Sequence, residues 1–295
     1  MIFLKTGLIV EGGGMKCAYS AGVLDIFLDE KVSFQYCMGV SAGAANVASF
    51  LAGQRDRNRR FYCIHPKSKD YFGVHSYFKT GDVFGLEYIY DNLSAEGGLD
   101  PLGYGEFMKN PAEMVFPATD ANTGKPHYFT KQDMKRNNFE TIKATCALPV
   151  LCRPIPIDGH EYFDGGVSDS LPLKKAIHDG CDKVVIILSK PLGYMMSPQK
   201  HRFFYTMDLH QYPHTISALN HRHEMYNKQM EYVKKLEKEG KVYLFAPSPD
   251  IKMSTYTMDD ATMNQLYENG VADAKAKLKE MKQFLQSDTE TEVNA

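Results

Sequence analysis

The chain has 295 residues, of which 43% are hydrophobic and 24% are charged, and these proportions are ordinary for a soluble globular protein. Its length fits one large domain, or one domain with an appendage, and allows a sizeable buried core. The formal net charge of −2 excludes the global basic field that would point to nucleic acid as a partner.

Cysteine spacing and hydropathy limit the kind of protein and the compartment that we expect. The six cysteines include no Cys-x-x-Cys pair, which argues against zinc-ribbon and thioredoxin-like sites and favours reduced thiols in a cytosolic core. Residues 1–10 are too short for a signal peptide and lack a small-residue cleavage site. The apolar run at 184–188 is far shorter than the roughly 20 residues that cross a bilayer. We therefore expect a cytoplasmic protein without a membrane span.

The first part of the chain alternates between strand and helix patterns. Residues 2–10 form a short apolar run typical of a buried strand, and residues 18–31 place apolar side chains at helical spacing. Residues 33–40 are predicted as a second strand that ends at Ser41, and residues 43–53 as a helix of small residues. This order predicts an α/β fold with a parallel sheet.

The middle of the chain is less regular. Residues 55–110 are rich in aromatic side chains but lack a clean period, so we expect a cap of short helices and loops. Residues 113–130 are predicted as two strands joined by a turn at 122–124. Residues 141–149 favour a helix that stops at Pro149.

Strand and helix signals then follow at short intervals. Asp158 and Gly159 form a strong hairpin signal between two predicted strands. Residues 171–180 favour a helix with proline in its first turn and glycine near its end. Residues 181–189 are predicted as another buried strand.

The composition changes after residue 190. Residues 198–240 and 258–286 are charged and mostly helical in pattern, with one predicted strand at 241–247 between them. We therefore divide the chain into a domain at 6–190 and a mostly helical extension at 191–295, which we expect to pack on that domain.

A Gly-x-Ser-x-Gly motif lies between the second predicted strand and the small-residue helix. This is the setting of a nucleophile elbow, in which a strained turn projects the serine Oγ above the sheet. Gly39 and Gly43 leave room where strand and helix nearly touch, and the helix N-terminus aims N–H groups at the serine. Ser41 is therefore a candidate nucleophile. The alternative is a small-residue turn with an ordinary serine.

Three consecutive glycines, Gly12, Gly13 and Gly14, follow the first predicted strand. A glycine-rich turn that leads into a helix offers backbone N–H donors with no side chain in the way. Acyl transfer needs such donors for the negative charge that develops on the carbonyl oxygen. We assign the three glycines to an oxyanion hole, with the Ala42 N–H as a further donor. Lys16 could add positive potential or tie down the loop.

Two nucleotide-binding interpretations of these glycines have less support. A dinucleotide fingerprint would need glycine where the chain has Cys17, and Asp29 and Glu30 precede the second strand rather than end it. A P-loop would need Gly-Lys-Ser or Gly-Lys-Thr, which the sequence lacks. A tight structural turn remains the plain alternative.

Asp164 ends a predicted strand and is followed by Gly165 and Gly166. From there its carboxylate can reach out of the sheet end, where ligands bind in open α/β sheets. The alternative is an ordinary turn-forming Asp-Gly pair. Only one strand and one helix precede Ser41, which argues against the common α/β-hydrolase topology.

These three motifs, in this order, resemble the patatin-like phospholipase family. The resemblance rests on Gly-Gly-Gly-x-Lys at 12–16, GVSAG at 39–43 and Asp-Gly-Gly at 164–166, and ATCALPVLCRPI at 144–155 is also similar to a family segment. It spans about residues 6–190. The stretch GVSAGAANVASFLAGQ is most similar to the bacterial patatin-like esterases.

The resemblance implies an α/β three-layer sandwich with a mostly parallel central sheet. It also implies an acyl-ester hydrolase of the phospholipase A or lysophospholipase type, which uses a Ser–Asp dyad and no histidine, metal or other cofactor. Carried over, Ser41 is the nucleophile, Asp164 is the base and residues 12–14 line the oxyanion hole. The family pattern has glycine where Cys17 stands.

The expected partner is a lipid or other acyl-ester substrate, and a peripheral membrane contact is left open. Two other functions also stay open. One is a non-catalytic lipid- or acyl-binding protein on the same fold, and the other is acyl transfer to an acceptor other than water.

Several further features have a plain and a functional interpretation. Five histidines between 201 and 223 lack a carboxylate at a familiar metal spacing and are expected on solvated helix faces. The basic run at 55–60 favours a solvated helix end over a phosphate or lipid-headgroup site. The aromatic stretch at 71–90 fits an acyl-chain groove, a lid or an ordinary core. Met195 and Met196 are weak lid candidates.

Overall fold

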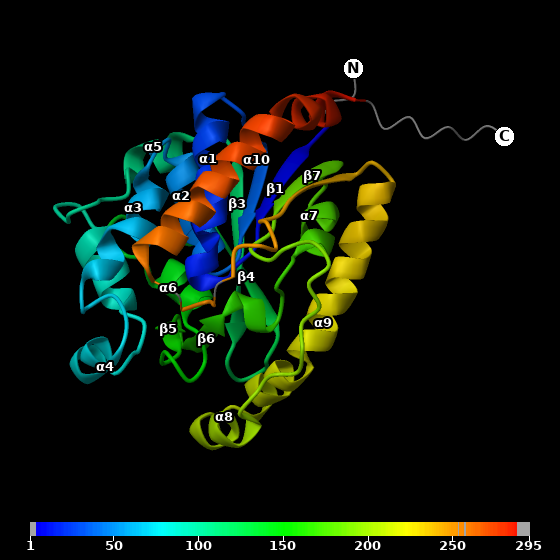
Figure 1. Ribbon diagram of the computed structural model, residues 1–295. Coiled ribbons are helices and arrows are strands. Elements are labelled where there is room, and N and C mark those ends of the chain that lie inside the picture. The colour runs from blue at the N-terminus through cyan, green and yellow to red at the C-terminus, as the bar shows by residue number, and fades with distance from the viewer. Residues whose placement is uncertain (1–3, 253, 257, 288–295) are drawn as a thin grey trace.

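A computed structural model describes residues 4–252, 254–256 and 258–287. An eight-stranded sheet runs through the molecule, with helices on both faces (Figure 1). Its strands are β1 (Thr6–Val10), β2 (Tyr36–Gly39), β3 (Glu113–Asp120), β4 (Pro126–Thr130), β5 (Ile155–Ile157), β6 (His160–Asp164), β7 (Lys183–Ile187) and β8 (Val242–Phe245).

The described helices comprise α-helices, short 3₁₀ turns and one π-helix. The α-helices are α1 (Ala18–Asp29), α2 (Ala42–Leu51), α3 (Arg57–Cys63), α4 (Val74–Thr80), α5 (Tyr104–Lys109), α6 (Glu140–Cys146), α7 (Leu173–His178), α8 (Arg202–Asp208), α9 (Pro213–Lys238) and α10 (Asp260–Gln286). Four short 3₁₀ turns are η1 (Gly14–Cys17), η2 (His65–Lys67), η4 (Lys131–Asp133) and η5 (Gly165–Val167), and η3 (Glu87–Leu93) is a π-helix.

The predicted elements agree with these bounds to within a few residues. Of the first predicted strand, residues 2 and 3 lie outside the described residues, and β1 begins at Thr6. The stretch 55–110 is the expected series of short helices and loops. The helix predicted to stop at Pro149 already ends at Cys146, two residues before the position whose backbone that proline restricts.

The sheet is parallel at its centre and antiparallel at one side. Strands β3, β2, β1, β7 and β8 are parallel neighbours in that order. Strand β6 pairs antiparallel with β3 and with β5, and β4 also pairs antiparallel with β3. The predicted α/β sandwich is therefore confirmed, with a mixed sheet.

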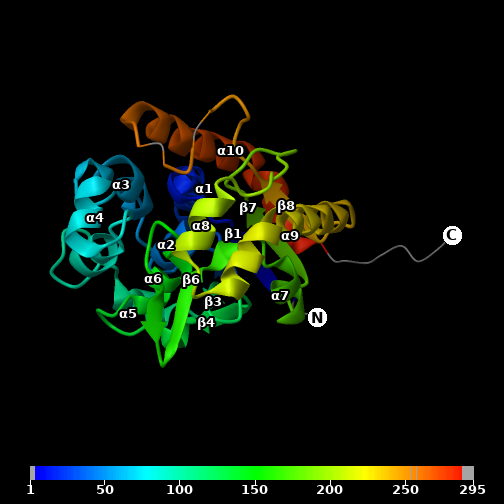
Figure 2. The same cartoon turned by 90° about the horizontal axis from the view of Figure 1, so that it is seen from below.

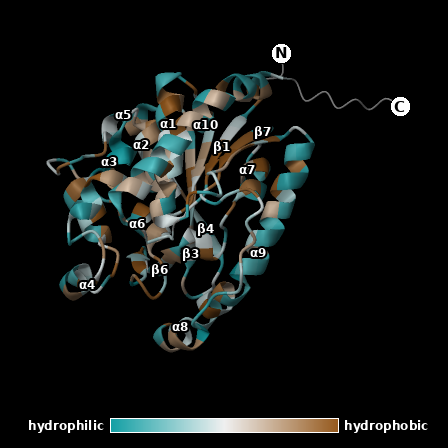
Figure 3. Cartoon of the chain, in the orientation of Figure 1, coloured by the Kyte–Doolittle hydropathy of each residue, from teal (hydrophilic) through white to brown (hydrophobic). Residues whose placement is uncertain are grey.

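Alternating side chains of the central strands supply two separate apolar layers. Leu8 and Val10 of β1 pack with α1, α2 and α10, whereas Ile9 points to the opposite face and packs with α7 and α9. Helices α9 and α7 cover one face in Figure 1, and α1, α2 and α10 cover the other. The central strands are largely apolar, whereas the residues of α9 are mostly hydrophilic (Figure 3).

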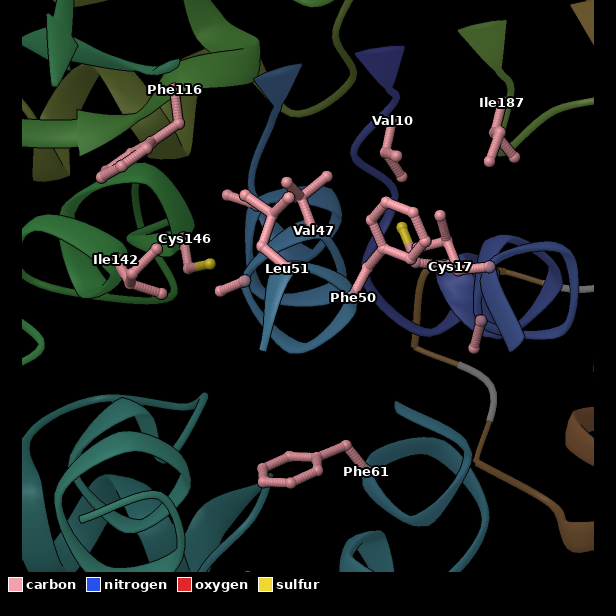
Figure 4. Packing of buried hydrophobic residues seen from close by; sticks show 14 of the residues in the cluster. Val10, Cys17, Val47, Phe50, Leu51, Phe61, Phe116, Ile142, Cys146 and Ile187 are labelled. Atoms are coloured by element: carbon pink, nitrogen blue, oxygen red, sulfur yellow. The ribbon is translucent and has the colours of Figure 1, made fainter. Parts of the chain in front are cut away.

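Helix α2 fills the space beside the sheet on the face that it shares with α1. Its side chains Val47, Phe50 and Leu51 lie between Cys146 of α6 and Cys17 of η1 (Figure 4). This packing fixes α2 directly behind the Ser41 turn, so the position of the candidate nucleophile depends on the core.

The C-terminal helix packs closely on α1. A Cβ at Gly22 would lie 2.1 Å from the Tyr267 carbonyl oxygen, and a Cβ at Gly270 would lie 2.1 Å from the Tyr19 carbonyl oxygen. The Tyr267 hydroxyl also donates a 2.8 Å hydrogen bond to the buried Asp25 carboxylate. Only glycine at both positions lets the two backbones approach this closely.

The prediction of a solvated basic run at 55–60 is wrong for Arg57, which is buried. Its guanidinium donates to Ser49 Oγ at 2.7 Å, to Ser94 Oγ at 2.8 Å and to the Asp100 carbonyl oxygen. Several polar partners that are remote in sequence satisfy the charge, and local sequence could not have indicated them. Over the ranges 4–252, 254–256 and 258–287, no helix is long and apolar enough to cross a membrane.

Candidate active site

Ser41 occupies a strained turn between β2 and α2. Its backbone has φ 53° and ψ −131°, a combination that residues other than glycine rarely adopt. A Cβ at Gly39 would lie 2.4 Å from Ala44 Cα, and one at Gly43 would lie 2.4 Å from the Val10 carbonyl oxygen. The two glycines therefore allow the sharp turn, which has the geometry of a nucleophile elbow.

This strain predicts a stability difference between two inactive variants. Ser41→Gly is expected to be more stable than Ser41→Ala, because glycine adopts this backbone conformation without the cost of about 1–3 kcal/mol. A net gain of about 1 kcal/mol would raise Tm by about 1–2 °C in a chain of 295 residues. Calorimetry of the two variants measures the difference, and equal Tm values would show that the turn stores no strain.

Strand β3 explains how Asp164 comes close to Ser41. Val115 of β3 pairs with Met38 of β2, and further along the strand Ala118 pairs with Asp164. Strand β4 pairs with β3 along this whole stretch, so β2 and β6 lie end to end along the other edge of β3. The end of β6 therefore lies just beyond the end of β2, where the Ser41 turn begins.

The Asp164 carboxylate is buried and held in place. Its Oδ1 accepts a 2.7 Å hydrogen bond from the Gly166 N–H, and its backbone N–H donates to the Ala147 carbonyl oxygen at 2.8 Å. Its Oδ2 is buried and makes no hydrogen bond to any described residue. The orientation of the carboxylate is thus fixed while one oxygen remains available.

Burial raises the pKa of the Asp164 carboxyl above its ordinary value. The Ser41 hydroxyl, the Arg222 guanidinium and the Gly166 N–H each oppose part of that rise. The Ser41 hydroxyl is thus near enough to influence the carboxyl, although no hydrogen bond of normal geometry joins the two side chains. Such bonds often tighten only when substrate binds.

The three glycines form a loop beside Ser41 that has no room for side chains. A Cβ at Gly12 would lie 2.9 Å from Ser41 Cβ, and one at Gly13 would lie 2.6 Å from Ser189 Oγ. Gly14 has φ 57°, a left-handed conformation that favours glycine. The N–H groups of all three, and that of Ala42, have no acceptor among the described residues.

Contacts from the end of β7 hold this loop. Buried Glu11 pairs with Lys190 and accepts a 2.7 Å hydrogen bond from the Ser189 N–H. The Ser189 hydroxyl donates to the Gly12 carbonyl oxygen at 2.7 Å. The loop is thus fixed through its carbonyl and acidic groups, which leaves its N–H groups free to point elsewhere.

Most of the predicted site residues line one cavity of about 200 Å³, which we call the polar cavity. Its lining includes Gly12, Gly13, Gly14, Lys16, Ser41, Asp164 and Gly166. Gly39, Gly43 and Gly165 lie behind it in close backbone contacts; a Cβ at Gly165 would lie 2.1 Å from the Pro117 carbonyl oxygen. Cys17, which stands where the family pattern has glycine, is buried, and its thiol donates to the Glu11 carbonyl oxygen.

A second cavity of about 70 Å³, the apolar cavity, adjoins Ser41 on the other side. Ser41, Gly14 and Leu148 line both cavities, and Ala42 lines the apolar one. The other walls of the apolar cavity are mostly apolar and include Met15, Ala45, Phe61, Tyr71, Phe84, Leu86, Ile89 and Tyr90. Several come from the aromatic stretch at 71–90, which thus contributes to a cavity wall beside the candidate nucleophile.

Sequence reasoning missed several groups at the site. The Thr145 hydroxyl accepts a 3.0 Å hydrogen bond from the Ser41 N–H. Arg222 and Tyr256, from the C-terminal extension, line the polar cavity. Thr145 lies in the segment 144–155, whose resemblance to a family segment could have pointed to it. The two extension residues lie in no recognisable motif, and only the fold places them.

Among the residues that the structure describes, no histidine lines the polar or the apolar cavity. His160 is exposed in the β5–β6 hairpin, and its Nδ1 lies 3.3 Å from an Asp120 carboxylate oxygen. Within the described part of the chain, no three His, Cys, Asp or Glu side chains gather as a metal site would require.

Comparison with known proteins agrees with these features. The profile of the family described as patatin-like phospholipase matches residues 8–177, and that of a domain of unknown function, DUF6363, matches residues 212–286. YjjU of Escherichia coli K12, described as an uncharacterized protein, is 26% identical over 197 residues, which cover 66% of this chain and 55% of YjjU. This chain thus spans little more than half the length of that relative.

Two solved structures are similar at low sequence identity. VipD from Legionella pneumophila has a TM-score of 0.49 at 11% identity, covering 94% of this chain and 67% of VipD. The type III effector protein ExoU has a TM-score of 0.43 at 10% identity, covering 95% of this chain and 53% of ExoU. Because the family profile covers more than half of the sequence, including the glycine loop, the serine turn and Asp164, the chain belongs to the patatin-like phospholipase family.

Proposed function

We propose that this protein is a serine acyl-ester hydrolase that acts on lipids, of the phospholipase A or lysophospholipase type. The observation that carries the proposal is the strained Ser41 turn next to a buried Asp164, of which one carboxylate oxygen bonds to none of the described residues. Both stand beside N–H groups that have no acceptor among the described residues. Nucleophile, base and oxyanion donors are the parts that acyl transfer needs.

The chemistry follows from this arrangement. Ser41 Oγ attacks the ester carbonyl carbon while Asp164 Oδ2 takes its proton. The N–H groups of the glycine loop and of Ala42 stabilise the oxyanion, which then collapses and expels the alcohol with the proton from Asp164. Water next attacks the acyl-enzyme and gives a proton to Asp164, and Asp164 returns this proton to Ser41 Oγ as the acid is released.

The two cavities suggest how the substrate lies. The apolar cavity is lined by aromatic and aliphatic side chains, so the acyl chain would bind there. The polar cavity would then receive the alcohol side of the ester and the attacking water. Because Ser41 lines both cavities, we expect the scissile bond to lie at their junction.

Hydrolysis of an ester panel with graded acyl length, with and without a phosphate head group, tests the proposal. Turnover, together with covalent labelling of Ser41 by a fluorophosphonate, would support a hydrolase. A folded protein that binds the lipid but neither turns it over nor takes the label would be a non-catalytic acyl-binding protein. Labelling with turnover only when an alcohol acceptor is added would identify an acyltransferase.

Catalysis is expected to need no divalent metal, because the proposed mechanism uses only a serine, a carboxylate and backbone donors. Activity on the preferred ester should be unchanged, within about twofold, after treatment with EDTA, since no step of acyl transfer in this scheme uses a metal-bound group. Loss of turnover in EDTA and its return with calcium would contradict the mechanism.

We further propose that the enzyme approaches its substrate through a peripheral membrane contact at α4 and α8. Phe78 of α4 is 82% exposed and Phe203 of α8 is 70% exposed, which is unusual for such large apolar side chains. Both helices lie at the lower end of the molecule in Figure 1 and face the viewer in Figure 2. Lys200 and Arg202 next to Phe203 fit an anionic lipid surface.

Removing these two aromatic side chains should weaken membrane binding. The double variant Phe78→Gln/Phe203→Gln is expected to lose about tenfold or more in partitioning onto vesicles that contain anionic lipid, since each loses a large apolar contact. Co-sedimentation measures the binding. The matched control is Leu99→Gln, which changes an equally exposed apolar residue in the loop between η3 and α5. An equal loss in both proteins would contradict the proposed face.

A further inference from the structure

A cation from the C-terminal extension reaches the catalytic cavity. Arg222 lies in α9, within the region matched by the domain of unknown function, and lines the polar cavity together with Ser41 and Asp164. Its Nε donates a 2.6 Å hydrogen bond to the Gly166 carbonyl oxygen. A Cβ at Gly166 would lie 3.2 Å from Arg222 Nη2, so the guanidinium lies directly against this glycine.

The Arg222 guanidinium keeps donors for another partner. A guanidinium has five N–H donors, and the bond to Gly166 uses only the one on Nε. Within the described residues, it makes no ion pair with a carboxylate. Its planar fork suits an oxyanion that accepts two parallel hydrogen bonds, as phosphate and carboxylate groups do.

The remaining charges of the polar cavity favour an anion. Lys190 is already paired with the buried Glu11, so this pair contributes little net charge. Lys16 lines the same cavity and, like Arg222, has no ion-pair partner in the part of the chain that the structure describes. Asp164 is the other carboxylate that lines the cavity, so two cations without salt bridges face one catalytic carboxylate.

The position of these cations relative to Ser41 indicates which part of a substrate they meet. Ser41 stands between the apolar cavity and the polar one, and Arg222 and Lys16 line only the polar one. An acyl chain in the apolar cavity would leave the alcohol side of the ester facing these cations. A negative group on that side would lie within their reach.

We propose that Arg222, assisted by Lys16, binds a phosphate on the alcohol side of the substrate ester and so determines specificity for anionic esters. This inference rests on the proposed hydrolase function, because it names the substrate class of the same site. It also gives the C-terminal extension a role in catalysis, since α9 supplies the recognition group.

The test compares two soluble short-chain esters with the same acyl chain, a monoacylglycerol and its 3-phosphate. Wild type is expected to prefer the phosphate ester in kcat/KM. Arg222→Gln keeps an N–H donor for the Gly166 carbonyl oxygen but removes the charge, and it should lower the ratio of the two kcat/KM values by about 10- to 100-fold, as loss of a charged hydrogen bond does. Lys228→Gln, a matched loss of charge at an exposed position of α9, should leave the ratio unchanged.

Three outcomes would overturn the inference. An equal fall in kcat/KM for both esters in Arg222→Gln would show that Arg222 only positions Gly166. Unchanged kcat/KM values for both esters in Arg222→Gln would show that Arg222 does not bind the phosphate. If Lys228→Gln also lowered the ratio of the two kcat/KM values, the preference would arise from the general positive charge of the protein rather than from Arg222.

A binding measurement separates this inference from the proposed hydrolysis. Glycerol 3-phosphate and inorganic phosphate are titrated into wild type and Arg222→Gln by calorimetry, which needs no turnover. Binding of glycerol 3-phosphate that Arg222→Gln loses would support the anion site even if no ester were hydrolysed. Binding of inorganic phosphate with no preference for the phosphate ester would assign the site to the free ion and overturn substrate recognition. If neither glycerol 3-phosphate nor inorganic phosphate bound while ester hydrolysis was normal, the hydrolase proposal would be supported and the anion site contradicted.

Discussion

Replacing Ser41 by alanine is expected to abolish ester hydrolysis and covalent labelling by a fluorophosphonate. The serine is the only group in the proposed scheme that forms a bond to the substrate, so its loss should cost on the order of 10⁴-fold or more in kcat, as for nucleophiles of other serine hydrolases. The side chain is nearly buried and points from a turn held by backbone contacts, so the fold should survive. Steady-state kinetics and mass spectrometry of the probe adduct measure the result.

The matched control for Ser41→Ala is Ser197→Ala, which removes a serine hydroxyl that lines the outer part of the same polar cavity. It should keep the label on Ser41 and retain most of the turnover, because it takes no part in bond making. Residual turnover by Ser41→Ala near that of wild type, after a check that both melt alike, would remove Ser41 as the nucleophile.

Replacing Asp164 by asparagine is expected to lower kcat by on the order of 10²-fold or more, because it keeps the shape and removes the base. Asparagine can still accept the Gly166 N–H bond through its carbonyl oxygen, so the site geometry should be retained. His160→Ala should stay within about tenfold of wild type, since this exposed residue lies outside both cavities. If His160→Ala lost its activity while Asp164→Asn kept it, the result would contradict the Ser–Asp dyad and indicate a mechanism that uses histidine.

The pH profile should carry the signature of Asp164. Burial raises the pKa of this carboxyl, and only the ionised form can accept the proton of Ser41. Activity of wild type should therefore rise with pH through a pKa above the ordinary 3.8 of an aspartate and then level off. The residual activity of Asp164→Asn should not show this rise with pH. The same rise in wild type and Asp164→Asn would assign the titration to another group.

The same pKa shift predicts that Asp164→Asn is more stable than wild type at neutral pH. A raised pKa means that the native state binds the proton more tightly than the unfolded state. Stability therefore falls as pH rises from the unfolded pKa to the folded one, and the loss is complete above the folded pKa. Asparagine has no charge to bury. Its advantage in Tm should be present at pH 7 and absent at pH values below the ordinary pKa of aspartate.

The local sequence determined the parts of this site that depend on short-range geometry. Gly39, Gly43 and the glycine loop are needed wherever backbones touch or turn sharply, so they marked the serine turn and the donor loop without any tertiary information. The Asp158-Gly159 pair likewise marked the hairpin, in which both residues have positive φ. Steric restrictions on the backbone act over a few residues, so the positions of glycine in the sequence indicate them directly.

The tertiary structure alone decided which of these parts meet and what surrounds them. Ser41 and Asp164 come together because β2 and β6 lie end to end along one edge of β3, a pairing that no local pattern encodes. Burial of Arg57 and the entry of Arg222 into the polar cavity depend on partners far along the chain. Desolvation, which raises the pKa of Asp164, likewise arises from the packed fold, because it depends on everything that excludes water from the carboxylate.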